Sequence, residues 1–374
     1  MNLRSLPIAI LALFIATPLH AQHTDANDMA AELGMRGSDI PAREMPGWNK
    51  PDDITILTFG PMPESGIGSR DWFREATGDV NVRFFPAGRD ADYGEIAGTD
   101  VIVGWCTPAA IAAAGNLQYL HIYSAGIDRC ASIPGIADRG LIATNSAKAA
   151  SETIAEHGIA LMLMLTRGLH QHHKNQMKGQ WRGYTSAPNA FAVKGKTMLV
   201  LGLGGIGSQV AKRAHGLGMT VLGTRNSSRR GPDYVDYVGL ADETITLAAK
   251  ADVIVNALPL TTATRGTVDA AFFDAMKEGA FYISVGRGGT TDTDALVAAL
   301  ESGDLAGAGL DVTDPEPLPV GHQLWEMPNV VISPHTAASS GMSRHNTMLL
   351  ARENLRRYIN GEKLLNTVDF ARGY

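Results

Sequence analysis

Three polar side chains, each following an apolar β-type run, carry the chemistry that this sequence suggests. They are Arg287, Glu316 and His335. An arginine between glycines can offer its planar fork to a carboxylate and polarise a neighbouring carbonyl. A histidine beside a carboxylate can pass a proton near neutral pH. Each residue alone has a structural explanation as a surface or loop residue, but together they suit reduction of a 2-oxo acid by hydride.

A glycine-rich turn supplies a candidate site for the hydride carrier. Gly202, Gly204, Gly205, Ile206 and Gly207 follow the apolar run Leu199–Leu201 and open a helical segment. Glycines at these places allow a sharp turn, a close approach of a pyrophosphate and tight packing of the helix, whose N-terminal amides point at the anion. The context of strand, glycine turn, helix and second strand predicts a dinucleotide-binding domain.

The end of the second strand indicates which dinucleotide binds. An NAD site usually has an acidic residue there for the ribose hydroxyl, whereas this chain has Thr224, Arg225, Asn226 and Ser227. An arginine can bind a 2′-phosphate through two hydrogen bonds, and serines can donate to it. The sequence therefore favours NADP(H), with NAD(H) possible; the alternative is a solvated arginine loop.

Two series of alternating strands and helices surround these residues. Apolar runs start at residues 54, 80, 101, 117 and 141, a long helix is expected from Ser151 to about Gly168, and six further strands start at residues 197, 220, 253, 281, 307 and 330. This alternation predicts an α/β protein with two doubly wound domains. We expect a first domain over residues 53–148, completed by 338–374 with its terminal helix, and a dinucleotide-binding domain over 149–337 that includes the linker helix.

The N-terminus suggests export. Arg4 precedes an apolar stretch that ends near Pro18, and Ala21 is a small residue suited to cleavage, so residues 1–21 resemble a signal peptide. We expect a periplasmic or secreted protein, or a cytoplasmic one if the true start is Met29 or Met35. Residues 22–52 are polar and aperiodic, which predicts a poorly ordered lead-in.

Composition narrows the partners. With 32 basic and 38 acidic side chains the formal charge is −6, which provides no bulk attraction to nucleic acid or to anionic lipid. No later run is long enough for a membrane span. The two cysteines, Cys106 and Cys130, could pair in an exported protein, although two buried free thiols are the commoner outcome. A metal site at His170, His172 and His173 is less expected than a hydrated cluster.

The combined motifs resemble the D-isomer-specific 2-hydroxyacid dehydrogenases from about Ile54 to the C-terminus. The resemblance rests on the glycine turn, "GRGG" at 286–289, "GLDVTDPEPLP" at 309–319 and "NVVISPHTA" at 329–337. It implies a flavodoxin-like substrate domain, a Rossmann domain, a cleft between them and a homodimer formed through the cofactor domains. The implied roles are as follows: substrate binding by Arg287, pairing of Glu316 with the proton donor His335, nicotinamide contact by Asp311, carboxylate binding by the loop Ser124, Ala125 and Gly126, and further coenzyme contacts by Leu258, Pro259 and Val285.

Departures from the family pattern leave alternatives open. Ser284 replaces a common asparagine, and Glu316 stands where formate dehydrogenases of this superfamily carry glutamine, which disfavours formate. Phosphite oxidation remains an alternative because that branch keeps the triad, and a non-catalytic dinucleotide-sensing interaction protein is another. Relatives with residues like Arg225 and Ser227 reduce glyoxylate or hydroxypyruvate with NADPH, so we expect that substrate class.

Overall fold

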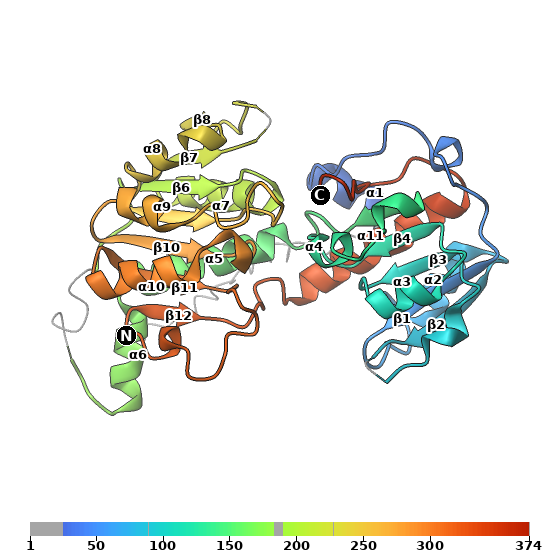
Figure 1. Ribbon diagram of the computed structural model, residues 1–374, viewed down its shortest axis with the longest axis horizontal. Helices are drawn as coiled ribbons and strands as arrows, with labels where there is room; N and C mark the ends of the chain where they lie inside the picture. The colour runs from blue at the N-terminus through green and yellow to red at the C-terminus, as the bar shows by residue number, and fades with distance from the viewer. Residues whose placement is uncertain (1–24, 89, 183–189, 227, 374) are drawn as a thin grey trace, which may run out of the picture.

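The computed structural model describes residues 25–373 except residues 89, 183–189 and 227. Its helices and strands form two α/β domains, each built on one parallel sheet (Figure 1). The predicted fold class is thereby confirmed. Most strands are buried over most of their length, which is why they read as nearly continuous apolar runs rather than as alternating ones.

The first domain holds a five-stranded sheet in the order β2-β1-β3-β4-β5. Its strands are β1 (Asp53–Thr58), β2 (Asn81–Pro86), β3 (Val101–Gly104), β4 (Tyr119–Ile122) and β5 (Ile142–Asn145). Its helices are α1 (Ala26–Glu32), α2 (Arg70–Thr77), α3 (Pro108–Ala113), α4 (Asp128–Ala131) and α11 (Gly341–Ile359), with 3-10 turns η1 (Ala42–Glu44), η2 (Tyr93–Ile96) and η3 (Ala137–Arg139). The C-terminal α11 packs against α2 and β4, so this domain is assembled from both ends of the chain (Figure 1).

The second domain holds a seven-stranded sheet in the order β12-β11-β10-β9-β6-β7-β8. Its strands are β6 (Thr197–Leu201), β7 (Thr220–Thr224), β8 (Tyr237–Gly239), β9 (Val253–Asn256), β10 (Ala280–Ser284), β11 (Leu305–Leu310) and β12 (Val330–Ile332). Its helices are α5 (Ser151–Thr166), α6 (Leu169–Met177), α7 (Gly205–Gly216), α8 (Thr244–Ala248), α9 (Ala270–Ala275) and α10 (Thr293–Ser302), with η5 (Ala241–Glu243), η6 (Gly288–Thr290) and η7 (Gln323–Trp325). The short edge strand β8 is one more than the six that the sequence predicted.

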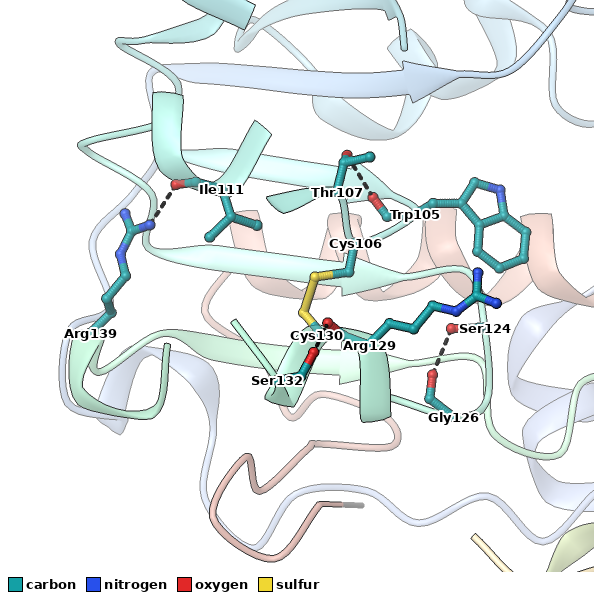
Figure 2. The surroundings of a disulfide bond; sticks show 10 residues. All are labelled: Trp105, Cys106, Thr107, Ile111, Ser124, Gly126, Arg129, Cys130, Ser132 and Arg139. Atoms are coloured by element: carbon teal, nitrogen blue, oxygen red, sulfur yellow. Dashed lines mark hydrogen bonds between the residues drawn. A yellow bond between two sulfur atoms is a disulfide. The ribbon is translucent and has the colours of Figure 1, made fainter. Parts of the chain in front are cut away.

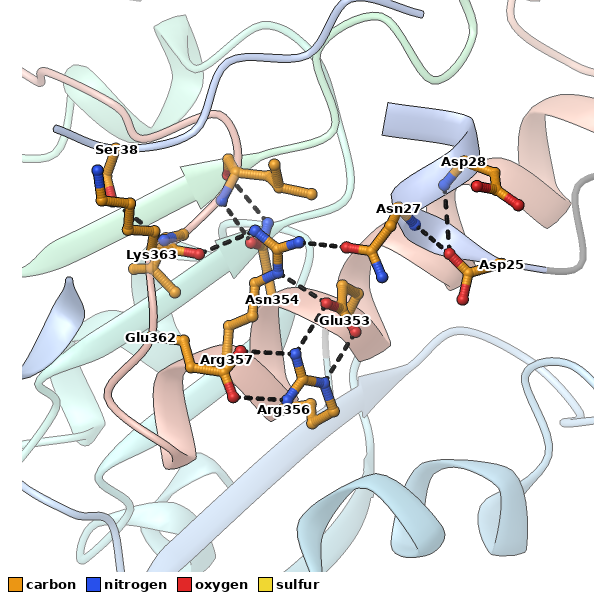
Figure 3. Close-up of polar contacts among 12 residues, drawn as sticks. Asp25, Asn27, Asp28, Ser38, Glu353, Asn354, Arg356, Arg357, Glu362 and Lys363 are labelled. Atoms are coloured by element: carbon orange, nitrogen blue, oxygen red, sulfur yellow. Dashed lines mark hydrogen bonds and ion pairs between the residues drawn. The ribbon is translucent and has the colours of Figure 1, made fainter. Parts of the chain in front are cut away.

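The lead-in is ordered from residue 25 onward, so the expectation of poor order is wrong for this part. The Asp25 carboxylate accepts hydrogen bonds from the amides of Asn27 and Asp28 at the start of α1, and these bonds hold its pKa below the usual value. Met29 is fully buried against Leu349 and Leu350 of α11. Figure 3 shows the polar side of this contact, where Arg357 donates to the Asn27 side chain. Apolar packing on α11, invisible in a local reading, orders the segment.

The two cysteines form a disulfide, so the expectation of free thiols is also wrong. Cys106 follows β3, Cys130 lies in α4, and their Cα atoms are 5.5 Å apart. Because β3 and β4 are neighbours in the sheet, the segments that follow them meet at the same edge (Figure 2). The bond ties α4 to the segment around Trp105, beside the loop Ser124–Gly126.

Candidate active site

The glycine turn lies between β6 and α7, as a dinucleotide-binding turn requires. Gly202 has φ 86°, a conformation that favours glycine, and its amide donates to the Thr224 hydroxyl at 3.1 Å. A Cβ on Gly207 would lie 2.0 Å from the Gly202 carbonyl oxygen. Gly204 is the N-cap of α7, and Gly205 and Ile206 begin the helix. The turn therefore forms a bare backbone cradle at a helix N-terminus, which is the geometry that binds a pyrophosphate.

Arg225 has an unmet hydrogen-bonding group at the end of β7. One of its Nη atoms donates to the Leu203 carbonyl at 2.9 Å, but its buried Nε has no partner among the described residues. An orphaned guanidinium donor beside a glycine cradle fits an anionic ligand. Asn226 follows in an exposed bend, and Ser227 lies outside the described residues.

The other expected coenzyme contacts border the same turn. Leu258 lies 3.2 Å from a Cβ placed on Gly202 and its amide donates to Asn256, while Pro259 follows it in the same loop. Val285 is buried at the end of β10, and its amide donates to the Asn256 carbonyl. The residues present therefore fit a dinucleotide lying across the carboxyl ends of β6, β7, β9 and β10.

His335 and Glu316 are paired. The Nδ1 atom of His335 lies 2.8 Å from a Glu316 carboxylate oxygen, which also accepts from Arg129 of α4 at 3.4 Å. The His335 backbone has φ 53°, an unusual value for a residue other than glycine. With Nδ1 bonded to a carboxylate, Nε2 is the ring nitrogen left to exchange a proton with a substrate.

Arg287 reaches across to the first domain. Its Nε donates to an Asp128 carboxylate oxygen at 2.9 Å, and its Nη1 donates to the Gly286 carbonyl at 3.0 Å. A Cβ on Gly126 would lie only 1.8 Å from Nη2, so the guanidinium lies directly over this glycine. Asp128 therefore fixes the plane of the fork and leaves Nη2 beside the loop expected to hold a carboxylate.

Hydrogen bonds fix the loop Ser124, Ala125 and Gly126. The Ser124 hydroxyl donates to the Gly126 carbonyl at 2.7 Å, and the Asn145 side chain donates to the Ala125 carbonyl at 2.7 Å. Within the described part of the chain, the amide hydrogens of Ala125 and Gly126 have no hydrogen-bond acceptor. With both carbonyls occupied, these amides and Arg287 form a compact anion-binding group.

Asp311 supports the His335 loop. Its carboxylate accepts from the Ser333 hydroxyl at 2.7 Å and from the amides of Thr336 and Ala337 at 2.9 and 3.0 Å. The Ser333 hydroxyl in turn lies 2.7 Å from Nε2 of His157 in α5. The sequence suggested a contact of Asp311 with the nicotinamide, which stays a prediction; in the structure both of its oxygens hold the loop that positions the proton donor.

Sequence reasoning did not single out Asp128, Arg129 or His157. Asp128 and Arg129 lie at the start of α4 and meet Arg287 and Glu316, which are more than 150 positions away along the chain. Asp128 and Arg129 come shortly after the loop Ser124–Gly126 in the sequence, so this adjacent pair of charged residues was the available signal. His157 looked like one more residue of a buried helix.

Two further expectations concern metals and membranes. His170, His172 and His173 lie on α6, where Nδ1 of His170 lies 3.2 Å from the Met164 carbonyl oxygen. Burial lowers the pKa of His170. Among the described residues, no group of three or more histidine, cysteine or acidic side chains is arranged to hold a metal ion. Within the same residues, no helix has the length and apolar character needed to cross a bilayer.

The fold and the site together define a class of protein. A dinucleotide cradle and a paired histidine and carboxylate follow strands of the same parallel sheet, and an arginine lies over the loop Ser124–Gly126. This arrangement can position a hydride donor, a proton donor and an anionic substrate side by side, which is what a nicotinamide-dependent dehydrogenase needs.

Comparisons with known proteins agree. Residues 159–337 match the family model described as "D-isomer specific 2-hydroxyacid dehydrogenase, NAD binding domain". The chain is 34% identical to the human glyoxylate reductase/hydroxypyruvate reductase over 68% of this chain and 77% of that protein. It is also 34% identical to the glyoxylate/hydroxypyruvate reductase B of Pectobacterium carotovorum over 68% of this chain and 80% of that protein.

A solved structure is similar over most of the molecule. The NADPH-dependent glyoxylate/hydroxypyruvate reductase of Sinorhizobium meliloti, in complex with NADP and sulfate, has a TM-score of 0.72 and 26% identity, and the match covers 86% of this chain and all of that one. The chain thus belongs to the D-isomer-specific 2-hydroxyacid dehydrogenase family. It is an NAD(P)-dependent oxidoreductase with the two-domain fold of that family.

Proposed function

We propose that this protein reduces small 2-oxo acids of the glyoxylate and hydroxypyruvate type with NADPH as the hydride donor. The observation that carries the proposal is that a paired proton donor and a carboxylate-binding arginine lie at one site. His335 is paired with Glu316 at 2.8 Å, and Arg287 lies over Gly126. The reductases among the similar proteins support the substrate class.

The side chains divide the reaction between them. The bound nicotinamide would deliver a hydride to the keto carbon. Arg287 and the amides of Ala125 and Gly126 bind the substrate carboxylate and hold the carbonyl near His335. His335 donates the proton that converts the developing alkoxide to a hydroxyl, and Glu316 stabilises the imidazolium before that transfer. The product is the 2-hydroxy acid, and the same groups catalyse the reverse oxidation.

The preference for NADPH is argued from Arg225. The end of β7 carries no carboxylate to bind a ribose hydroxyl, and the orphaned Nε of Arg225 suits a phosphate oxygen. Solved neighbours with bound NADPH or NADP support this choice. NAD(H) lacks the 2′-phosphate, so we expect it to bind and to do so more weakly.

We also propose that the protein forms a homodimer through its cofactor domain. Helix α6 has no buried residue, and the exposed fractions of Leu169 and Met177 on it are 52% and 75%. The nearby Trp181 is fully exposed. Large apolar side chains gathered on one projecting helix favour a covered surface. Light scattering coupled to size-exclusion chromatography tests this assembly.

Export to the periplasm or the medium is proposed as well. The signal-like residues 1–21 lie outside the described residues, but cleavage after Ala21 would leave Asp25 to cap α1. The disulfide between Cys106 and Cys130 supports an oxidising compartment. The burial of Met29 favours a start upstream of α1. Sequencing the N-terminus of the protein from its own cells tests the proposal; an intact Met1, or a start at Met29 or Met35, contradicts it.

Steady-state assays test the main proposal. Purified protein is given glyoxylate, hydroxypyruvate, pyruvate and bulkier 2-oxo acids with NADPH and then with NADH, and oxidation of phosphite and formate is assayed with NADP⁺. We expect the highest kcat/KM for glyoxylate or hydroxypyruvate with NADPH. A preference for phosphite, or no turnover of any 2-oxo acid, would contradict the proposal.

A further inference from the structure

A lysine borders the glycine turn from the segment that joins the two domains. Lys148 follows β5, has φ 73°, and its Cγ lies 3.0 Å from a Cβ placed on Gly205. Gly205 is the first residue of α7, where the cradle described above would receive a pyrophosphate. Lys148 therefore stands at the edge of the phosphate-binding part of the coenzyme site, although neither the sequence motifs nor the catalytic mechanism assigned it a role.

The N-terminal segment meets Lys148 at this point. The Lys148 ammonium donates to the Gly34 carbonyl. Asn366 joins the segments on either side, because its amide donates to the Arg36 carbonyl and its side chain donates to the Ala147 carbonyl, both at 2.8 Å. A β-bridge pairs Gly37 with Leu365. These bonds fix the backbone of Arg36, which belongs to a part of the chain outside the family model, close to Lys148.

Three positive charges consequently gather around the turn. Partial burial lowers the pKa of Lys148, and the charges of Arg36 and Arg225 lower it further. Within the described residues, neither Lys148 nor Arg225 has an ion pair with a carboxylate. Like charges held together repel one another, and an anion bound among them relieves that repulsion. The group is thus suited to a ligand with several negative charges.

We propose that Arg36 and Lys148 bind the pyrophosphate of the coenzyme, so that residues 34–38 form one wall of the coenzyme site. The inference rests on the proposed use of a nicotinamide dinucleotide and adds residues that lie outside the dinucleotide-binding domain. Arg225, at the end of β7, binds the 2′-phosphate, whereas Lys148 and Arg36 lie on the side of Gly205. The two groups of cations therefore serve different phosphates of the same molecule.

Binding measurements on the apo protein test the assignment. The Kd values of NADPH and NADH are measured by fluorescence titration for the wild type, Arg36→Gln, Lys148→Gln and Arg225→Gln. Arg43→Gln is the matched control, because it removes one charge from the same exposed N-terminal segment at a place that contacts Gly361 instead. Thermal unfolding of each variant checks that the fold is intact, and Arg36→Lys checks that charge can rescue binding.

We expect Arg36→Gln and Lys148→Gln to raise both Kd values by about tenfold, as loss of a charge-assisted hydrogen bond does. Their ratio of NADPH to NADH affinity should stay that of the wild type, while Arg225→Gln weakens NADPH selectively. Arg36→Lys should recover most of the loss, and Arg43→Gln should bind as the wild type.

Two results would overturn the inference. Unchanged Kd values in the folded Arg36→Gln and Lys148→Gln variants would show that neither residue touches the coenzyme. A loss confined to NADPH would assign them to the 2′-phosphate instead of the pyrophosphate. A wild type that binds NADH more tightly than NADPH would contradict the coenzyme preference proposed earlier, and it would leave the comparison of variants with wild type intact.

Discussion

The catalytic groups and the coenzyme-phosphate groups of this protein are prepared in different ways. His335 and Arg287 each have a carboxylate partner, Glu316 at 2.8 Å and Asp128 at 2.9 Å. Around the glycine turn the cations Arg225 and Lys148 have no carboxylate partner among the described residues, and the Arg225 Nε has no hydrogen-bond partner among them. The catalytic residues are therefore oriented before substrate binds. The cations around the glycine turn, by contrast, acquire their negatively charged partners only when the coenzyme binds.

The largest effect is expected from substitutions that break the pair of His335 and Glu316. His335→Gln removes the proton donor and should lower kcat by about a thousandfold, in the range usual for a general acid. Glu316→Gln keeps a hydrogen-bond acceptor but not the charge that stabilises the imidazolium, so its kcat should fall by less than that of His335→Gln. Pre-steady-state and steady-state rates with glyoxylate measure both, and NADPH binding should be unchanged in both. A His335→Gln enzyme with wild-type kcat would contradict the proton-transfer role.

A smaller effect is expected when the orientation of Arg287 is disturbed. Asp128→Ala frees the guanidinium that lies over Gly126 and should raise the KM of the 2-oxo acid about fivefold, because a partly exposed ion pair contributes on the order of 1 kcal/mol. Asp128→Asn keeps an oxygen acceptor for Nε, so its KM should lie between those of Asp128→Ala and the wild type. If both variants kept the wild-type KM and changed only kcat, Asp128 would not act through the carboxylate-binding arginine.

The smallest effect should come from added salt, which should weaken coenzyme binding more than substrate binding. Raising the salt concentration from about 0.02 to about 0.2 M shortens the distance over which charges act. The coenzyme meets several unpaired cations, so its Kd should rise a few-fold, whereas the KM of the substrate at Arg287, whose charge Asp128 already balances, should change by less. Equal salt dependence of the two constants would mean that the regions do not differ as described.

Local signals carried most of what the sequence could predict. The glycine turn, the arginine between glycines and the histidine after a strand are short patterns whose geometry depends on their own few residues, and the structure has them at strand ends. The parallel strands were legible because burial on both faces makes them continuously apolar. The same reasoning identified the long helix α5.

Long-range contacts account for what the sequence could not predict. Asp128 acquires its position from Arg287, which lies 159 residues further along the chain. The order of α1 depends on Leu349 and Leu350, and the disulfide depends on how two adjacent strands end. In each case the decisive neighbour is remote in sequence, so no local periodicity could have shown it.

The contact of α1 with α11 has a practical consequence for anyone who shortens this chain. Cutting away everything before β1, as a comparison with the family's domains would encourage, would uncover Leu349, Leu350 and Leu365, which now pack under Met29 and Ala30. Such an exposed apolar surface on a helix promotes aggregation in solution. A recombinant protein that starts at about residue 22 would keep these leucines covered.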